Sequence, residues 1–271
     1  MQQILIIFIC FLCTNIYGQK LIFQENKKKL SELITLTHSG ENDSIRADAH
    51  NNFLQLLNHT LSLKKSYLYS FNDIEYLSVL QPKNRKFKIF TWFLPLKSGS
   101  VEYFGIIQKC KKNGKKCEIY YLQETLDINN HNLYAELQTE DWYGCLYYEI
   151  IPVKFGKETY YTLLGWDGND AITTKKIIDV LYIPKKKHPV FGADIFKNTQ
   201  YRMVIEYSSQ YPISLKYDKD LEYIVFDHLE PMDGMSTNNF SIYATNLSYD
   251  ILKKTENGWE LEENIYLNNT K

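Results

Sequence analysis

Two short stretches of this chain are apolar at nearly every position: Phe87–Leu94 reads FKIFTWFL, and Tyr160–Trp166 reads YYTLLGW. Their length and their aromatic and β-branched content favour strands over helices. Successive side chains of a β-strand point to opposite faces, so each of these strands must be covered on both faces. The chain must therefore curl its sheet, pack two sheets together or cover a sheet with helices.

Further strands are predicted after about residue 74, where apolar residues recur at period two. The expected strands are Phe87–Leu94, Val101–Cys110, Cys117–Leu122, Tyr143–Val153, Thr159–Trp166, Lys176–Ile183, Tyr201–Tyr207, Ile213–Tyr217, Tyr223–His228 and Trp259–Leu267. Short turns such as Asn113-Gly114 and Asn257-Gly258 require antiparallel neighbours. About ten strands are too few for a complete propeller of four-stranded blades.

Residues 25–62 follow the helical period instead. Leu30, Leu33 and Ile34 share one face of a first helix, and Asp43 or Ser44 is the expected N-cap of a second. The predicted fold class is therefore α+β. N-terminal helices precede an antiparallel β-meander of about ten strands, arranged as a curled sheet, a sandwich or part of a propeller.

The chain opens with MQQILIIFICFLCTNIYG, in which the apolar run from Ile4 to Cys13 spans ten residues. Such a run is too short to cross a bilayer and is typical of a signal-peptide core. Ile16 and Gly18 suit cleavage before Gln19, although no Lys or Arg precedes the run. A short N-terminal anchor is the alternative.

We therefore expect a periplasmic or extracellular protein after cleavage following Gly18, with no transmembrane helix in the mature chain. The expected division is a signal peptide over residues 1–18, a helical segment over 19–74 and an antiparallel β domain over 75–271.

The net charge of −1 gives the chain no strong overall field for nucleic acid, which is not expected as a partner. Tyr, at 22 residues, outnumbers Gly, at 12. AT-rich coding is one explanation, and an aromatic surface that binds sugars is the other. The second explanation would make a glycan or another envelope component the partner.

The stretch GWDGND (165–170) places Asp167, Asn169 and Asp170 directly after an apolar strand. Oxygen ligands at alternate positions resemble the start of a calcium loop, but position five is Ala171 and no Glu stands at position twelve. The favoured interpretation is a structural turn in which Gly168 takes a positive φ. Asp167, Asn169 and Asp170 are the metal candidates, and no cofactor is expected apart from calcium at this loop.

A second group of polar residues lies in FDHLEPMDG (226–234). Asp227 and His228 are sequential on a predicted strand and so face opposite sides. We interpret His228 as a core or edge histidine with one hydrogen bond. Asp167, Asp170, Asp227 and His228 are nevertheless the catalytic candidates if their strand ends meet. The chain contains no Gly-x-Ser-x-Gly, no His-Glu-x-x-His and no phosphate-binding glycine loop.

In CKKNGKKC (110–117), a two-residue turn at Asn113-Gly114 would pair Cys110 with Cys117. An oxidising compartment then favours a disulfide, with the α-carbons about 5.5 Å apart if the pair is hydrogen-bonded. The lysines at the tip form a solvated hairpin end or bind an anionic polymer. Cys145, in WYGCLYY, is predicted to be a buried free thiol.

Five segments carry a resemblance: WYGCLYYEIIPV (142–153), YYTLLGWDGND (160–170), TKKIIDVLYI (174–183), YIVFDHLEP (223–231) and SYDILKKTENGWELEENI (248–265). Through them the chain resembles a family of uncharacterised secreted proteins of Bacteroidota over roughly residues 75–267. The resemblance implies an exported protein of the periplasm or cell exterior. It implies no activity and no catalytic residue.

The leading hypothesis is an exported, non-enzymatic protein of the cell envelope that binds a ligand or has a structural role. The alternative is a secreted hydrolase, carbohydrate-directed in one version, that uses carboxylates near Asp167 and Asp227. A cleft shared by Asp167, Asp170, Asp227 and His228 would favour the enzyme.

Overall fold

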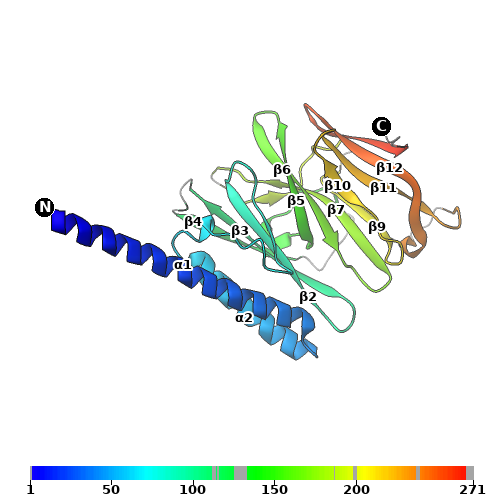
Figure 1. Ribbon diagram of the computed structural model, residues 1–271. Helices are drawn as coiled ribbons and strands as arrows, with labels where there is room; N and C mark the ends of the chain where they lie inside the picture. Colours follow the sequence, from blue (N-terminus) through cyan, green and yellow to red (C-terminus); the bar gives the residue numbers. More distant parts are fainter. Residues whose placement is uncertain are drawn as a thin grey trace. The chain divides into compact units, whose positions relative to one another are not determined.

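A computed structural model describes residues 2–111, 114, 116–124, 133–185, 187–197, 200–235 and 239–266 (Figure 1). The chain divides into two compact units. The first contains Met1–Leu77 and Cys110–Cys117, and the second contains Ser78–Lys109 and Glu118–Lys271. The predicted α+β class is confirmed, because two N-terminal helices precede thirteen antiparallel strands in the described parts of the chain.

The first unit is built on helices α1 (Gln2–Ser39) and α2 (Asp43–Ser62), followed by the 3-10 turn η1 (Ser66–Leu68). Figure 1 shows α2 running back along the C-terminal half of α1. Asn42 caps α2, because its side chain accepts a hydrogen bond from Ile45 N at 2.9 Å. The expected cap at Asp43 or Ser44 was therefore one or two residues late.

Helix α1 continues through Gly18 without a break. The structure describes the chain before any processing, so cleavage after Gly18 stays a prediction. Among the described residues, no helix combines the length and the apolar character needed to cross a membrane.

The predicted disulfide between Cys110 and Cys117 is confirmed. Their α-carbons lie 4.1 Å apart, closer than the spacing of about 5.5 Å for a hydrogen-bonded pair. Gly114 N donates to Lys111 O at 2.8 Å, a hydrogen bond that a two-residue turn at Asn113-Gly114 would not make. Asn113, the other residue of the expected turn, lies outside the described residues.

Three meanders follow one another in the chain. The first sheet contains β1 (Ser78–Leu80), β2 (Phe87–Pro95), β3 (Val101–Cys110) and β4 (Cys117–Gln123). The middle sheet contains β5 (Leu146–Phe155), β6 (Glu158–Asp167), β7 (Thr173–Tyr182), β8 (Val190–Phe191) and β9 (Met203–Ser208), with β8 and β9 both pairing with β7. The last sheet contains β10 (Leu215–Asp218), β11 (Tyr223–Pro231), β12 (Tyr243–Thr255) and β13 (Gly258–Ile265).

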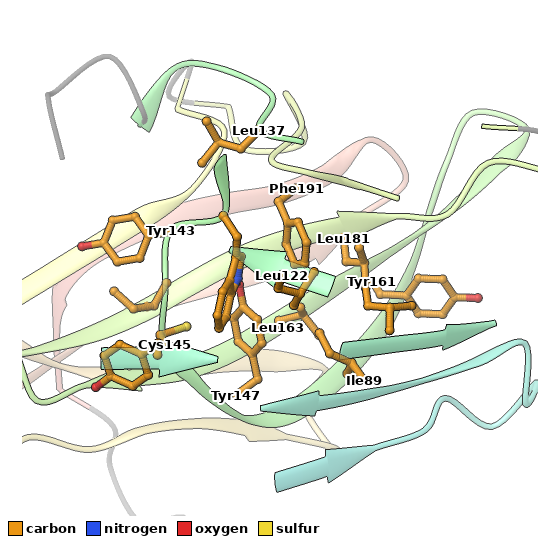
Figure 2. Close-up of a cluster of buried hydrophobic side chains, with 14 of the residues drawn as sticks. Ile89, Leu122, Leu137, Tyr143, Cys145, Tyr147, Tyr161, Leu163, Leu181 and Phe191 are labelled. Carbon is orange, nitrogen blue, oxygen red and sulfur yellow. The ribbon is translucent and has the colours of Figure 1, made fainter. Parts of the chain in front are cut away.

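The middle sheet is buried on both faces, as its apolar strands require. On β6, Leu163 joins a core with residues of the first sheet, whereas Leu164 joins a core with residues of the last sheet. Ile177 and Ile178 divide in the same way on β7. Figure 2 shows the first of these cores, with Leu163 near the side chain of Leu122 from β4.

Strand β12 was missed from the sequence, as were the short strands β1 and β8. Its pairing with β11 shifts between Asp227 and Leu229, where three residues of β12 oppose one of β11. Within this bulge Leu247 has φ +72° and is 80% exposed. The bulge interrupts the alternation of apolar and polar positions on which strand prediction depends.

The glycine of the β12–β13 hairpin is required by a close backbone approach. Gly258 has φ +107°, and a Cβ built there would lie 2.0 Å from Ile195 O. Trp259 N donates to the same carbonyl at 2.7 Å. The hairpin of β5 and β6 turns at Gly156, also at positive φ, but a Cβ there would meet no atom within 4 Å.

One ion pair of the second unit is completely buried. Arg202 Nε donates to Asp179 Oδ1 at 3.1 Å, and neither side chain is exposed. Tyr147 donates its hydroxyl to Asp179 Oδ2 at 2.8 Å, and Arg202 Nη1 donates to Ala135 O at 3.2 Å. Because buried charges need partners, this network holds β7 to the segment before β9.

Candidate functional site

The carboxylates of the GWDGND loop accept hydrogen bonds from the backbone of the loop in which they lie. Asp167 is buried at the end of β6, and its Oδ1 accepts from Asn169 N at 2.8 Å. Gly168 N donates to the hydroxyl of Tyr103 at 2.7 Å. Asp170 Oδ1 accepts from two backbone N–H groups at the start of β7, at 2.7 and 2.8 Å. These bonds are those of a structural turn.

The conformation of this loop differs from the expectation at one position. Asn169, not Gly168, has the positive φ, at +50°. Asn is one of the few residues that enter this region readily, because its side chain can bond locally. Here Asn169 Oδ1 accepts from Lys175 Nζ at 2.8 Å, so a cation already occupies this oxygen.

No cluster of three His, Cys, Asp or Glu side chains suited to a metal ion occurs among the residues that the structure describes. The calcium hypothesis for Asp167, Asn169 and Asp170 stays a prediction.

A further carboxylate, Glu124, belongs to the same region and was not predicted from the sequence. Glu124 follows β4, and its Oε2 accepts from Tyr103 N at 2.7 Å. The side chain of Tyr103 also bonds to Asp167, so one tyrosine touches both carboxylates. The sequence signal that could have identified Glu124 is its position at the end of a strand rich in apolar residues, which is also the position of Asp167.

The environment of these two carboxylates favours their neutral forms. Burial raises the pKa of Glu124 to about 7, with a smaller upward contribution from the charge of Asp167. Burial also raises the pKa of Asp167. A Cβ built on Gly144 would lie 2.6 Å from Glu124 Cγ, so this glycine makes room for the acid. Burial thus acts in the same direction on both acids, and neither Glu124 nor Asp167 is among the described residues that line three surface grooves, which lie within residues 19–69, 24–74 and 203–263.

Cys145 is a buried free thiol, as predicted. Figure 2 shows it between Tyr143 and Tyr147. Burial raises the pKa of this thiol, with the charge of Asp179 acting in the same direction. A cysteine held in its neutral form without solvent access is not a nucleophile.

The other candidate residues, Asp227 and His228, line a groove in the second unit. The groove has a volume of about 260 Å³ and lies where β9 of the middle sheet meets β11, β12 and β13 of the last sheet. It is lined by Met203, Val204, Ile205, Glu206, Phe226, Asp227, His228, Leu229, Phe240, Tyr243, Asp250, Leu261 and Glu263. The lining therefore combines four carboxylates and one histidine with apolar side chains, and no Lys or Arg is among its described residues.

The histidine of this groove is oriented by an acid. His228 Nδ1 lies 2.7 Å from Asp250 Oδ1, and Asp250 Oδ1 also accepts from Asn264 N at 2.9 Å. A carboxylate only accepts, so a neutral His228 must carry its proton on Nδ1. Its Nε2 then remains an acceptor, 3.8 Å from Glu230 Oε1.

The groove gathers only some of the sequence candidates. Asp227 and His228 line it, whereas Asp167 and Asp170 are not among its described lining residues. Glu206 links the two regions, because it lines the groove and accepts from Thr173 Oγ1 at 2.7 Å at the edge of the GWDGND loop. The groove could not be foreseen, because its walls come from strands of two different sheets.

No family model, curated protein or solved structure matches this chain.

Proposed function

We propose that this protein is an exported, non-enzymatic binding protein of the cell envelope. In this proposal, the groove between β9 and the last sheet takes a ligand that combines a positive charge with an apolar body. The observation that carries the proposal is the lining of the groove, which combines four carboxylates with aromatic and aliphatic side chains and has no lysine or arginine among its described residues.

The carboxylates differ in how much of their hydrogen-bonding capacity remains for a ligand. Asp250 is committed to His228 and Asn264, and Glu206 accepts from Thr173. Glu263 is exposed on β13 and is the acid best placed to meet a cation. Phe240 and Tyr243, whose ring centroids lie 5.4 Å apart, supply aromatic surface suited to a cation or a flat apolar group.

The test is calorimetric titration with three probes of the same shape and different charge: phenethylamine, 2-phenylethanol and phenylacetate. We expect the amine to bind most tightly and the carboxylate not to bind. Glu263→Gln should weaken amine binding several-fold, because it removes a charge at contact distance. Glu262→Gln is the matched control, since Glu262 is the preceding residue of β13, pairs with Lys253 and is not among the described residues that line the groove.

Equal binding of the three probes, or a preference for phenylacetate, would refute the cationic ligand. A neutral oligosaccharide in the same titration tests the glycan partner expected from the tyrosine content.

The hydrolase alternative is favoured by one observation, the contact of 2.7 Å between His228 and Asp250 in the groove. This pair could activate water, because the acid would stabilise the imidazolium that forms. The described lining contains no Ser, Thr or Cys, so the nucleophile would be water or one of the carboxylates, such as Asp227. Hydrolysis of 4-nitrophenyl esters or glycosides that is lost in His228→Asn would establish an enzyme.

A further inference from the structure

One end of the first unit concentrates positive charge. Three segments contribute to it, residues 14–24, 61–72 and 110–117. Together they contain seven lysines and no aspartate or glutamate, although the whole chain has a net charge of −1. The charge of this end therefore differs in sign and size from that of the protein as a whole.

Contacts within the unit bring the three segments together. Gln19 Nε2 donates to Lys64 O at 2.6 Å, which ties α1 to the segment that follows α2. A Cβ built on Gly114 would lie 3.3 Å from Leu68 Cγ, so the tip of the disulfide hairpin lies against the same segment. The described parts of the three segments thus lie at the same end of the first unit.

We call five described lysines the lysine patch: Lys20, Lys64, Lys65, Lys111 and Lys116. All five are exposed. Within the described part of the chain, none of them is paired with a carboxylate, whereas Lys27 and Lys28 of α1 both are. The positive charge of the patch is therefore available to an external anion.

Apolar side chains stand among these lysines. Leu21, Ile22 and Leu68 are 51%, 46% and 58% exposed. Leu68 also borders a hollow of about 180 Å³, whose lining includes the stacked rings of Phe23 and Tyr69 with centroids 4.8 Å apart. Exposed aliphatic groups gain from entering an apolar phase but gain nothing from a hydrated polyanion.

We propose that this end of the first unit docks on the surface of an anionic membrane. The lysine patch binds lipid phosphate groups, while Leu21, Ile22 and Leu68 enter the boundary between headgroups and acyl chains. The proposal is independent of the groove in the second unit and of any ligand there. Each lysine near an anionic surface contributes about fivefold in affinity, and the attraction falls with salt.

The experiment is sedimentation of the full chain with vesicles of phosphatidylcholine alone or with added phosphatidylglycerol. Residues 2–18 are present in every sample, so a difference in binding between vesicles with and without anionic lipid reports on the lysine patch. We expect binding to rise at least about tenfold with phosphatidylglycerol and this gain to disappear at high salt. Lys64→Glu with Lys65→Glu should abolish the gain. Lys216→Glu with Lys219→Glu, at exposed lysines of the second unit, should retain it.

Two further measurements separate a membrane from a soluble polyanion. Leu68→Ser should weaken binding to the anionic vesicles and leave binding to polyphosphate unchanged, because only the membrane has an apolar phase. The proposal is overturned if phosphatidylglycerol gives no gain, or if Lys64→Glu with Lys65→Glu binds like the wild type. Lysine-dependent binding to polyphosphate without vesicle binding would assign the patch to a polyanion instead. Circular dichroism of each variant checks that the fold is retained.

Discussion

Replacing Glu124 by glutamine should change how the stability of the protein depends on pH. An exposed glutamate titrates near 4.5, and burial raises the pKa of Glu124 to about 7 in the folded state. The folded protein therefore holds this proton more tightly than the unfolded chain. The resulting stabilisation is complete below the unfolded pKa and is lost as the pH rises through the folded pKa.

The magnitude follows from the two pKa values. At 1.36 kcal/mol for each pKa unit, their separation corresponds to about 3.4 kcal/mol. Glu124 is only partly buried, and solvent screening reduces the effect to ~1–2 kcal/mol. Glutamine cannot ionise, yet its side-chain oxygen can still accept from Tyr103 N. Between about pH 5 and about pH 8, the wild type should therefore lose ~1–2 kcal/mol more free energy of unfolding than Glu124→Gln.

Urea denaturation followed by tryptophan fluorescence at several pH values measures this difference. Glu136→Gln is the control, because Glu136 is an exposed carboxylate of the same unit and its charge is not among those that raise the pKa of Glu124. Its profile should follow that of the wild type. Parallel profiles for the wild type and Glu124→Gln would refute the reasoning, as would a wild type that gains stability relative to the variant as the pH rises.

Three further variants test other parts of the fold. Burial lowers the pKa of His50 to about 4, so the free energy of unfolding should fall as the pH drops from about 6.5 towards 4. In urea titrations across that range, His50→Gln should lack this loss. His59→Gln, at an exposed residue of the same helix, should keep it. Asp179→Asn should cost about 3–5 kcal/mol of unfolding free energy, because it leaves a guanidinium buried without its counter-charge; a cost below about 1 kcal/mol would contradict this. Gly258→Ala should lower the melting temperature far more than Gly156→Ala. Each substitution adds backbone strain of roughly 1 kcal/mol, but only the new Cβ at residue 258 meets a carbonyl oxygen. Equal melting temperatures would show that the β12–β13 hairpin shifts freely.

The sequence predicted the sheets better than the sites. Apolar residues at successive positions of YYTLLGW required cover on both faces, and Leu163 and Leu164 enter two different cores. Strand β12 was not predicted, because its bulge around Leu247 breaks the period of two on which strand prediction depends. Patterns within a strand report burial, but they do not report where a strand is irregular.

The sites depend on contacts between residues far apart in the chain. Glu124 and Asp167 lie close because Tyr103 bonds to both, and nothing in the local sequence of either acid indicates the other. Likewise, Asp250 orients His228 across the bulged register of β11 and β12. The disulfide was predictable for the opposite reason, because both of its cysteines belong to one short hairpin.

The double-sided middle sheet has a consequence for the growing chain on the ribosome. Strands β5 to β9 can pair once residue 208 has emerged, and the first sheet is then available to cover one of their faces. Much of the cover of the face that carries Leu164, Ile178 and Val180 comes from β11, β12 and β13, which follow later in the chain. Until these strands are in place, the chain exposes apolar surface to other nascent chains and to chaperones. A chain that stops before β11 should therefore aggregate rather than persist as a smaller folded protein.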